Sequence, residues 1–279
     1  MENEHSIFQD AHTLFKTLSA NYPFAEYDSV GKSLLGREIP VLHIGKGNKT
    51  ILLIGGAAAN DPISPSLLLR FSKDLCTQIS KENTLYGLNC SFIKGSRRVV
   101  ILPLLNPDGN RLVQNGPSQE SPLYERQLRQ NGMKNDFSAW IGNARGVCLD
   151  MNLNDDFAAR RGELNQNGMP NITGEYPESE PETAYATRII HTLSPVFVLE
   201  CSISSRNAIH TNRQDLIARI AKNTDYVVCD QQIYGFPSWF ARTYQRPAAH
   251  LTVSSSLSAK KPYANLREFL FRCLYAVST

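Results

Sequence analysis

The sequence lacks the features of a membrane protein, a nucleic-acid-binding protein or a disulfide-stabilised protein. No run approaches the roughly 20 apolar residues of a membrane-spanning helix. The net charge is only +3, and the densest basic cluster is the short run 94–98, so no nucleic-acid surface is indicated. The six cysteines are scattered and form no C-x-x-C pair, which favours free thiols. The polar start carries no signal-peptide pattern, so we expect a cytoplasmic protein.

The 279-residue chain contains no repeat, low-complexity tract or Gly/Ser linker, and 42% of its residues are hydrophobic. We therefore expect a single domain over 1–279. Uninterrupted apolar runs predict buried strands, and helical periodicity separates them. The predicted strands are 38–44, 50–55, 98–105, 196–199 and 249–253, and the predicted helices lie near 8–18, 64–79, 180–193 and 266–274. This order predicts an α/β fold with a mixed, mostly parallel sheet flanked by helices.

Two further segments carry local signals. Ser179-Glu180-Pro181-Glu182 has the pattern of a capping box and predicts the start of the helix at 180–193. The segment 106–177 is rich in Gly, Asn and Pro and shows little periodicity. Irregular segments of this length usually carry a site in an ordered domain, so we expect it to line a concave, polar pocket.

Several short blocks, taken in order, resemble a known family. They are S-L-L-G-R-E-I at 33–39, G-G-A-A-A-N-D at 55–61, N-P-D-G at 106–109, N-A-R-G-V-C-L-D-M-N at 143–152, S-E-P-E-T at 179–183, W-F at 239–240 and R-P-A-A-H-L-T-V at 246–253. The set resembles the zinc carboxypeptidases of the carboxypeptidase A type. It is most similar to the bacterial members that cut γ-D-glutamyl–diamino-acid bonds in cell-wall peptides. The resemblance implies their fold, a zinc cofactor and peptide ligands.

The resemblance also locates the metal site, and there the chain departs from the family. The two His and one Glu that bind zinc in the family correspond to Ala58, Asp61 and Cys201. Ala58 has no donor atom, and Asp61 is one methylene shorter than Glu, so we expect it to cap the following helix instead. Cys201 is expected to be a buried strand-end residue. The Asp that supports a zinc-binding His corresponds to Cys148, which gives no such support.

The positions for catalysis and substrate binding have changed as well. The general-base Glu corresponds to Thr252, which cannot accept a proton from water near neutral pH. The Asn and Arg that hold a substrate carboxylate correspond to Asp150 and Met151, so a less anionic ligand is expected. Arg145 is retained and could attract an anion or be a solvated loop residue. Among the histidines, only His250, on the same strand face as Thr252, is expected near the site.

These substitutions favour a carboxypeptidase-like pseudoenzyme that needs no cofactor and keeps a cleft for a peptide, such as a cell-wall peptide, or another partner. Two alternatives stay open from the sequence. One is an active metallocarboxypeptidase or γ-D-glutamyl peptidase with a rearranged metal site. The other is a thiolate-assisted metal site formed by Asp61, Cys148 and Cys201, because a deprotonated cysteine is a competent soft ligand.

Overall fold

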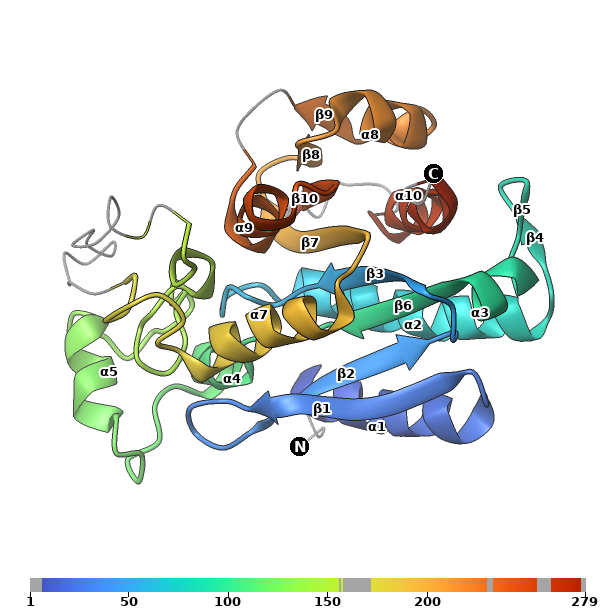
Figure 1. The fold of residues 1–279 in the computed structure, drawn as a ribbon. Coiled ribbons are helices and arrows are strands. Elements are labelled where there is room, and N and C mark those ends of the chain that lie inside the picture. Colours follow the sequence, from blue (N-terminus) through green and yellow to red (C-terminus); the bar gives the residue numbers. More distant parts are fainter. Residues whose placement is uncertain (1–6, 156, 158–171, 230–232, 255–261, 277–279) are drawn as a thin grey trace.

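The computed structural model describes residues 7–155, 157, 172–229, 233–254 and 262–276 (Figure 1). An eight-stranded sheet has the order β1-β2-β6-β3-β7-β10-β8-β9. Its strands are β1 (Ala25–Lys32), β2 (Glu38–Ile44), β3 (Lys49–Ile54), β6 (Arg97–Leu102), β7 (Phe197–Ser204), β8 (Ala208–Thr211), β9 (Val227–Cys229) and β10 (Ala248–Ser254). The central strands β6, β3, β7 and β10 run parallel, whereas β1, β2 and β8 pair in antiparallel fashion. The predicted mixed, mostly parallel sheet is confirmed.

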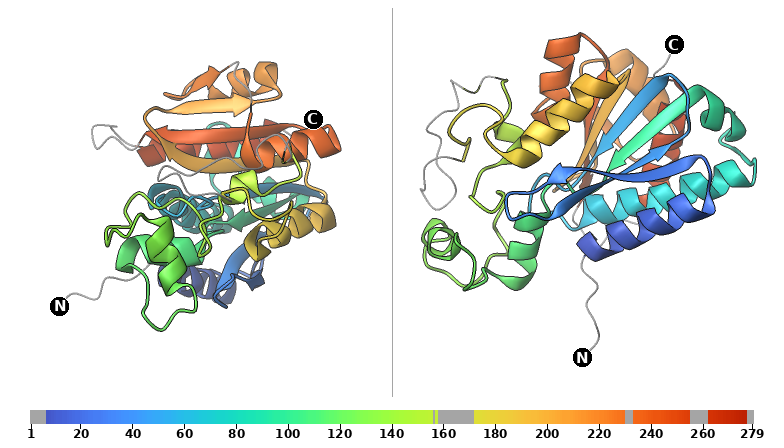
Figure 2. Two further views of the ribbon diagram at one scale, coloured as in Figure 1. Left: turned by 90° about the vertical axis from the view of Figure 1, so that its left-hand side faces the viewer. Right: turned by 60° about the horizontal axis from the view of Figure 1, so that its bottom comes forward.

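Helices cover both faces of this sheet (Figure 2). Apolar residues of α1 (Ile7–Asn21), α2 (Ile63–Ser80), α3 (Ser91–Ser96), α8 (Gln214–Ala221) and α10 (Pro262–Ala276) pack in one core on the first face. A second core on the opposite face contains residues of α7 (Pro181–Leu193) and α9 (Gly235–Tyr244). A small hairpin, β4 (Thr84–Leu85) and β5 (Leu88–Asn89), lies outside the main sheet. Among the described residues, no helix is both long and apolar enough to cross a membrane.

Strand β3 shows why the apolar runs form buried strands. Successive side chains of a strand point to opposite faces, so a strand covered on both sides must be apolar at every position. Ile51 and Leu53 lie in the core beneath α2, and Leu52 and Ile54 lie in the core beneath α7 and α9. All four side chains are fully buried. The same alternation in β7 and β10 decides which side chains can meet at the site.

The predicted strands at 38–44 and 50–55 and the helices at 64–79 and 180–193 are confirmed within one residue or so. The strand predicted to reach 105 ends at Leu102, because Pro103 supplies no N–H to a ladder. The prediction of a capping box is wrong. Glu180 is the N-cap residue just before Pro181, and no side chain caps the helix there. The Ser179 hydroxyl donates to the Glu180 carboxylate instead. The Glu182 carboxylate instead accepts from the backbone N–H of Leu34.

The irregular segment 106–177 contains α4 (Pro107–Asn115), α5 (Tyr124–Gln130) and the short 3₁₀ helix η1 (Leu149–Met151). Figure 1 shows these elements at the edge of the sheet where β6 ends. Asn106 ties the segment to the sheet, because its side chain caps α4 at Gly109 N and donates to the carbonyls of Ala57 and Gly142. Residues 156 and 158–171 of the segment lie outside the described part.

Candidate functional site

The loop after β3 carries Ala58 and Asp61 to the carboxyl edge of the sheet. Asp61 is 1% exposed. Its Oδ1 accepts from the N–H groups of Ile63 at 3.0 Å and Ser64 at 2.9 Å, and its Oδ2 accepts from the Ser64 hydroxyl at 2.6 Å. The backbone N–H of Ile203, near the end of β7, also favours the ionised form of this carboxylate. Three hydrogen bonds therefore engage both oxygens of the carboxylate with the start of α2.

Burial also weakens Asp61 as a possible metal ligand. Desolvation raises the pKa of its carboxyl, and the hydrogen bonds with Ser64, Ile63 and Ile203 oppose this rise. The expected capping function is present, since the side chain holds two backbone N–H groups at the start of α2. The buried carboxylate thus holds the start of α2, and both of its oxygens are already engaged by protein donors.

Cys201 and Thr252 reach the same edge of the sheet but point to opposite faces. Cys201 is 2% exposed and packs in the core beneath α2, α8 and α10. In the β7–β10 register, Leu251 lies beside Cys201, and Thr252 lies beside Ser202. The Thr252 hydroxyl donates to the Arg206 carbonyl at 3.1 Å. The expected meeting of these positions at one edge is therefore seen for the backbone, but not for the side chains of Cys201 and Thr252.

These donors do not fit a zinc ion held in the family's manner. Ala58 has no ligating atom, both oxygens of Asp61 are hydrogen-bonded to the start of α2, and Cys201 faces the core. Burial raises the pKa of the Cys201 thiol, whereas a metal binds the thiolate. Within the described residues, no three His, Cys, Asp or Glu side chains gather as a metal site. The thiolate site considered from the sequence, which includes Cys148, is thus not assembled by these side chains.

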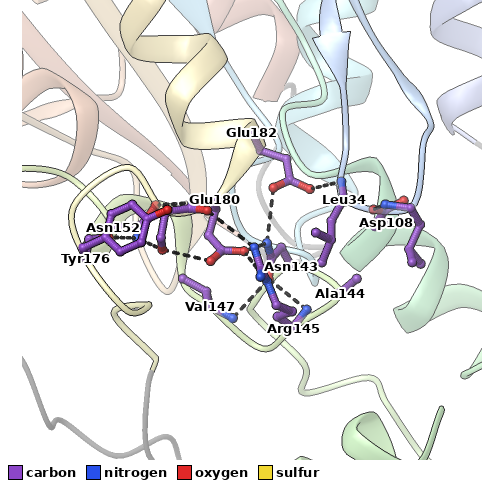
Figure 3. A network of polar contacts seen from close by, with 12 residues as sticks. Leu34, Asp108, Asn143, Ala144, Arg145, Val147, Asn152, Tyr176, Glu180 and Glu182 are labelled. Atoms are coloured by element: carbon purple, nitrogen blue, oxygen red, sulfur yellow. Dashed lines mark hydrogen bonds and ion pairs between the residues drawn. The ribbon is translucent and has the colours of Figure 1, made fainter. Parts of the chain in front are cut away.

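The retained Arg145 is part of a buried polar network rather than a solvated loop residue (Figure 3). Its Nε lies 3.1 Å from Glu180 Oε2, and the Arg145 and Glu180 side chains are 29% and 2% exposed. Its Nη2 donates to the Ser179 carbonyl. The Arg145 guanidinium is therefore paired with Glu180 while 29% of its side chain stays exposed, and anion binding by Arg145 stays a prediction.

Asn143 holds the same network together (Figure 3). Its Oδ1 accepts from the N–H groups of Arg145 and Val147, and its Nδ2 donates to Glu180 at 2.6 Å and Glu182 at 3.2 Å. Asn143 is fully buried, and Glu182 is fully buried as well. This side chain therefore fixes the loop that leads to η1 against the start of α7.

Glu182 should make the stability of the protein depend on pH. Burial raises the pKa of its carboxyl to about 7, from an ordinary value of 4.5. The folded state then binds the proton more tightly, so this contribution is complete below pH 4.5 and is lost as the pH rises to about 7. We expect a loss of about 3 kcal/mol across this range, at 1.36 kcal/mol per pKa unit. Urea unfolding from pH 4.5 to 8 measures it.

Glu182→Gln should flatten this part of the pH dependence, because the amide does not titrate. Glu175→Gln is the matched control, since Glu175 is exposed and lies shortly before the same helix. The difference in unfolding free energy between wild type and each variant is the quantity to compare. Equal pH slopes for the wild type and Glu182→Gln would contradict the assignment.

Asp150, at a position expected to bind a substrate carboxylate, forms an acidic pair with the buried Glu200. Glu200 of β7 is 1% exposed, and the Asp150 carboxyl of η1 lies close enough to influence its ionisation. Glu200 Oε2 accepts from Phe236 N at 3.2 Å. Burial, followed by the neighbouring Asp150 carboxyl, raises the pKa of Glu200 well above its ordinary value. Each of the two carboxyl groups therefore disfavours the ionisation of the other.

The start of α9 is shaped around this pair. Gly235 has a φ of +68°, and a Cβ there would lie 2.8 Å from Glu200 Oε2 and 3.2 Å from Asp150 Cγ. The tight, left-handed backbone therefore requires glycine. Met151 follows in η1 and is partly buried. The sequence interpretation missed Glu200, although a carboxylate inside the apolar run of β7 was a visible signal for a buried polar contact.

His250 lies beside this pair, on the face of β10 expected from the sequence. Its Nε2 is 2.7 Å from Ser202 Oγ, and its Nδ1 is 3.8 Å from Glu200 Oε2. The ring of Tyr234 lies over it at a centroid distance of 4.1 Å. Burial lowers the pKa of His250 to about 3, so the ring is neutral near pH 7. Ser202 was not singled out from the sequence, because the resemblance directed attention to its neighbour Cys201.

The predicted concave pocket is present only in part. A hollow of about 170 Å³ is lined by polar and apolar residues of the segment 131–146 and by Ile172. Its described lining does not include Arg145, Asp150 or Met151. In the described part of the chain, the irregular segment thus lines this hollow and contributes to a second one of about 130 Å³ that includes Asp108 and Arg111.

The order of the strands, the irregular segment at their carboxyl edge and the blocks at 106–109 and 179–183 define a zinc carboxypeptidase architecture. The sequence profile described as zinc carboxypeptidase matches residues 11–249. The chain belongs to this family.

A curated relative and two solved structures are similar to the chain. The γ-D-glutamyl-L-diamino acid endopeptidase 1 of Lysinibacillus sphaericus is 26% identical over 254 residues, covering 86% of this chain and 63% of that protein. Bovine thrombin-activatable fibrinolysis inhibitor, solved with tick carboxypeptidase inhibitor, has a TM-score of 0.70 at 14% identity, covering 98% of this chain and 97% of the other. Murein-tripeptide amidase MpaA from Escherichia coli O157 gives 0.52 at 18% identity, covering 88% and 91%.

The structural matches show the fold alone, because their sequence identities to this chain are below 25%. Two curated relatives match most of this chain, but the chain spans only about half to two thirds of their own length. The second of these, the uncharacterised protein YqgT of Bacillus subtilis (strain 168), is 27% identical over 203 residues, which are 70% of this chain and 50% of that protein.

Proposed function

We propose that this member of the zinc carboxypeptidase family is a pseudoenzyme with respect to zinc-dependent peptide hydrolysis and acts by binding a peptide at the carboxyl edge of its sheet. The proposal rests on the hydrogen bonds that already engage the Asp61 carboxylate. Both of its oxygens are hydrogen-bonded by Ile63 and Ser64 at the start of α2. The other two ligand positions offer an alanine and a thiol directed into the core. None of the six cysteines, all of which lie in the described part of the chain, forms a disulfide, which supports a cytoplasmic location.

The peptide class follows from two lines of support. The curated relative named for γ-D-glutamyl-L-diamino acid cleavage favours a cell-wall peptide. The acidic pair of Asp150 and Glu200, where the family has a basic clamp, disfavours a free carboxylate at that subsite. We therefore propose that the bound peptide presents an amide or an internal peptide bond there rather than a free C-terminus.

Peptide binding tests the proposal. Calorimetry with γ-D-glutamyl-diamino-acid peptides should show tighter binding of the amidated form than of the free acid, by roughly fivefold to tenfold, because one extra like charge at a partly exposed site costs about 1 kcal/mol. Asp150→Asn should reduce this preference. Asp136→Asn is the control, since Asp136 is fully exposed on the same segment.

Two outcomes would contradict the proposal. If neither peptide form binds, the edge is not a peptide site. If the peptides are hydrolysed and a chelator abolishes the hydrolysis, the alternative of an active metallopeptidase with a rearranged site is correct.

A further inference from the structure

Three side chains on one face of β7 and β10 form an ordered series of functional groups. Glu200 and His250 are direct neighbours in the β7–β10 register, and Ser202 lies two residues beyond Glu200. Ser202 Oγ is 2.7 Å from His250 Nε2, and Glu200 Oε2 is 3.8 Å from His250 Nδ1. Ser202 is partly exposed, whereas Glu200 and His250 are each 1% exposed. The partly exposed Ser202 hydroxyl is thus followed by the buried His250 imidazole and then by the buried Glu200 carboxyl.

This is the arrangement by which hydrolases on unrelated folds activate a serine. We propose that Ser202 is a nucleophile for small acyl groups carried by oxygen esters, with His250 as its base and Glu200 orienting the imidazole. The inference goes beyond the proposed binding function, because it requires neither zinc nor a bound peptide.

The surroundings of Glu200 support its orienting function. Phe236 N–H donates to Oε2 at 3.2 Å, and the Asp150 carboxyl is a second close neighbour of this buried group. A proton on Nδ1 would face Glu200 Oε2 and leave the Nε2 lone pair for the Ser202 hydroxyl; this tautomer is assigned from the neighbouring groups. The separation of 3.8 Å exceeds a hydrogen bond, and such contacts are often long before a substrate binds.

The neighbouring Tyr234 defines the approach to Ser202. Its hydroxyl lies close enough to Ser202 to interact with it, and 38% of the residue is exposed. This hydroxyl is a side-chain donor, within the described part of the chain, that can face an oxyanion formed at Ser202. Its ring lies against His250 at a centroid distance of 4.1 Å and shields the imidazole on that side.

The reaction balances with these groups alone. Ser202 Oγ bonds to the ester carbonyl carbon, and its proton passes to His250 Nε2. The bond from that carbon to the alcohol oxygen breaks, and the alcohol leaves with the proton from Nε2. Water then attacks the acyl-serine and gives one proton to Nε2. The carboxylic acid leaves as that proton returns to Oγ. A weakly basic imidazole activates the Ser202 hydroxyl only modestly, so oxygen esters, which are more reactive acyl donors than amides, are the expected substrates.

An activity-based probe tests the proposal directly. A fluorophosphonate should label the wild-type protein in the presence of EDTA, and peptide mass spectrometry should locate the adduct on Ser202. The same protein should hydrolyse p-nitrophenyl acetate. Ser202→Ala should abolish labelling and lower the ester rate about 100-fold, the usual range for losing an activated group. Ser204→Ala should behave like the wild type, since Ser204 lies on the same face of the same strand.

The site of labelling in the unmodified protein keeps the test valid even if a variant fails to fold. No adduct on the wild type, or an adduct on another residue, would overturn the proposal. Labelling that persists in Ser202→Ala would overturn it as well. Because EDTA is present and no peptide is added, a negative result leaves the peptide-binding proposal untouched, and the two can fail separately.

Discussion

Replacing Cys201 with histidine, the residue type that binds zinc at this position in the family, should destabilise the protein by about 3–5 kcal/mol. Cys201 is 2% exposed and lies in the core formed with α2, α8 and α10. The imidazole is larger than the thiol and polar at two atoms. The register places the neighbouring Leu251 in the same core, so no hydrogen-bonding partner is provided on that strand. Urea unfolding monitored by circular dichroism measures the loss.

Cys148→His is the matched control for this substitution. Cys148 is only partly buried and lies just before η1, so the same imidazole should cost about 1 kcal/mol or less there, as for most surface changes. If Cys201→His is as stable as the wild type and binds zinc tightly, its side chain faces the cleft, and the assignment of Cys201 to the core is wrong.

Much of the fold could be predicted because its signals are local. The apolar runs of β2, β3 and β10 are long enough to identify strands buried on both faces, and the periodicity of α2 and α7 is clear. Strand β1 was missed because it is an edge strand with polar residues such as Glu26 and Asp28 alternating along it. Strands β8 and β9 were missed because they are only four and three residues long.

The candidate site was predicted less completely, because its contacts join distant parts of the chain. The positions of Ala58 and Asp61 followed from short motifs beside a recognisable strand. Arg145 and Glu180 are 35 positions apart in the sequence, so no local pattern predicts their ion pair. The direction of Cys201 could have been inferred from alternation, since Phe197 and Leu199 precede it on the same face of β7.

The same reasoning explains the failed capping box. Ser179 and Glu182 have the correct spacing, but each is engaged by groups outside the helix. Asn152 donates to the Ser179 hydroxyl, and Leu34 donates to Glu182. In a buried network, tertiary donors therefore replaced the local hydrogen bonds that the motif predicts.

The second large effect concerns zinc itself, and it tests the central claim that the family's metal site is not assembled. Protein purified and dialysed with added zinc, then freed of excess metal, should contain far less than one zinc per chain by mass spectrometric metal analysis. The reason is the donor set: Ala58 has no ligating atom, Asp61 is a buried carboxylate already hydrogen-bonded at both oxygens, and Cys201 is a buried thiol whose pKa is raised. About one zinc per chain, lost in Asp61→Ala, would contradict the account.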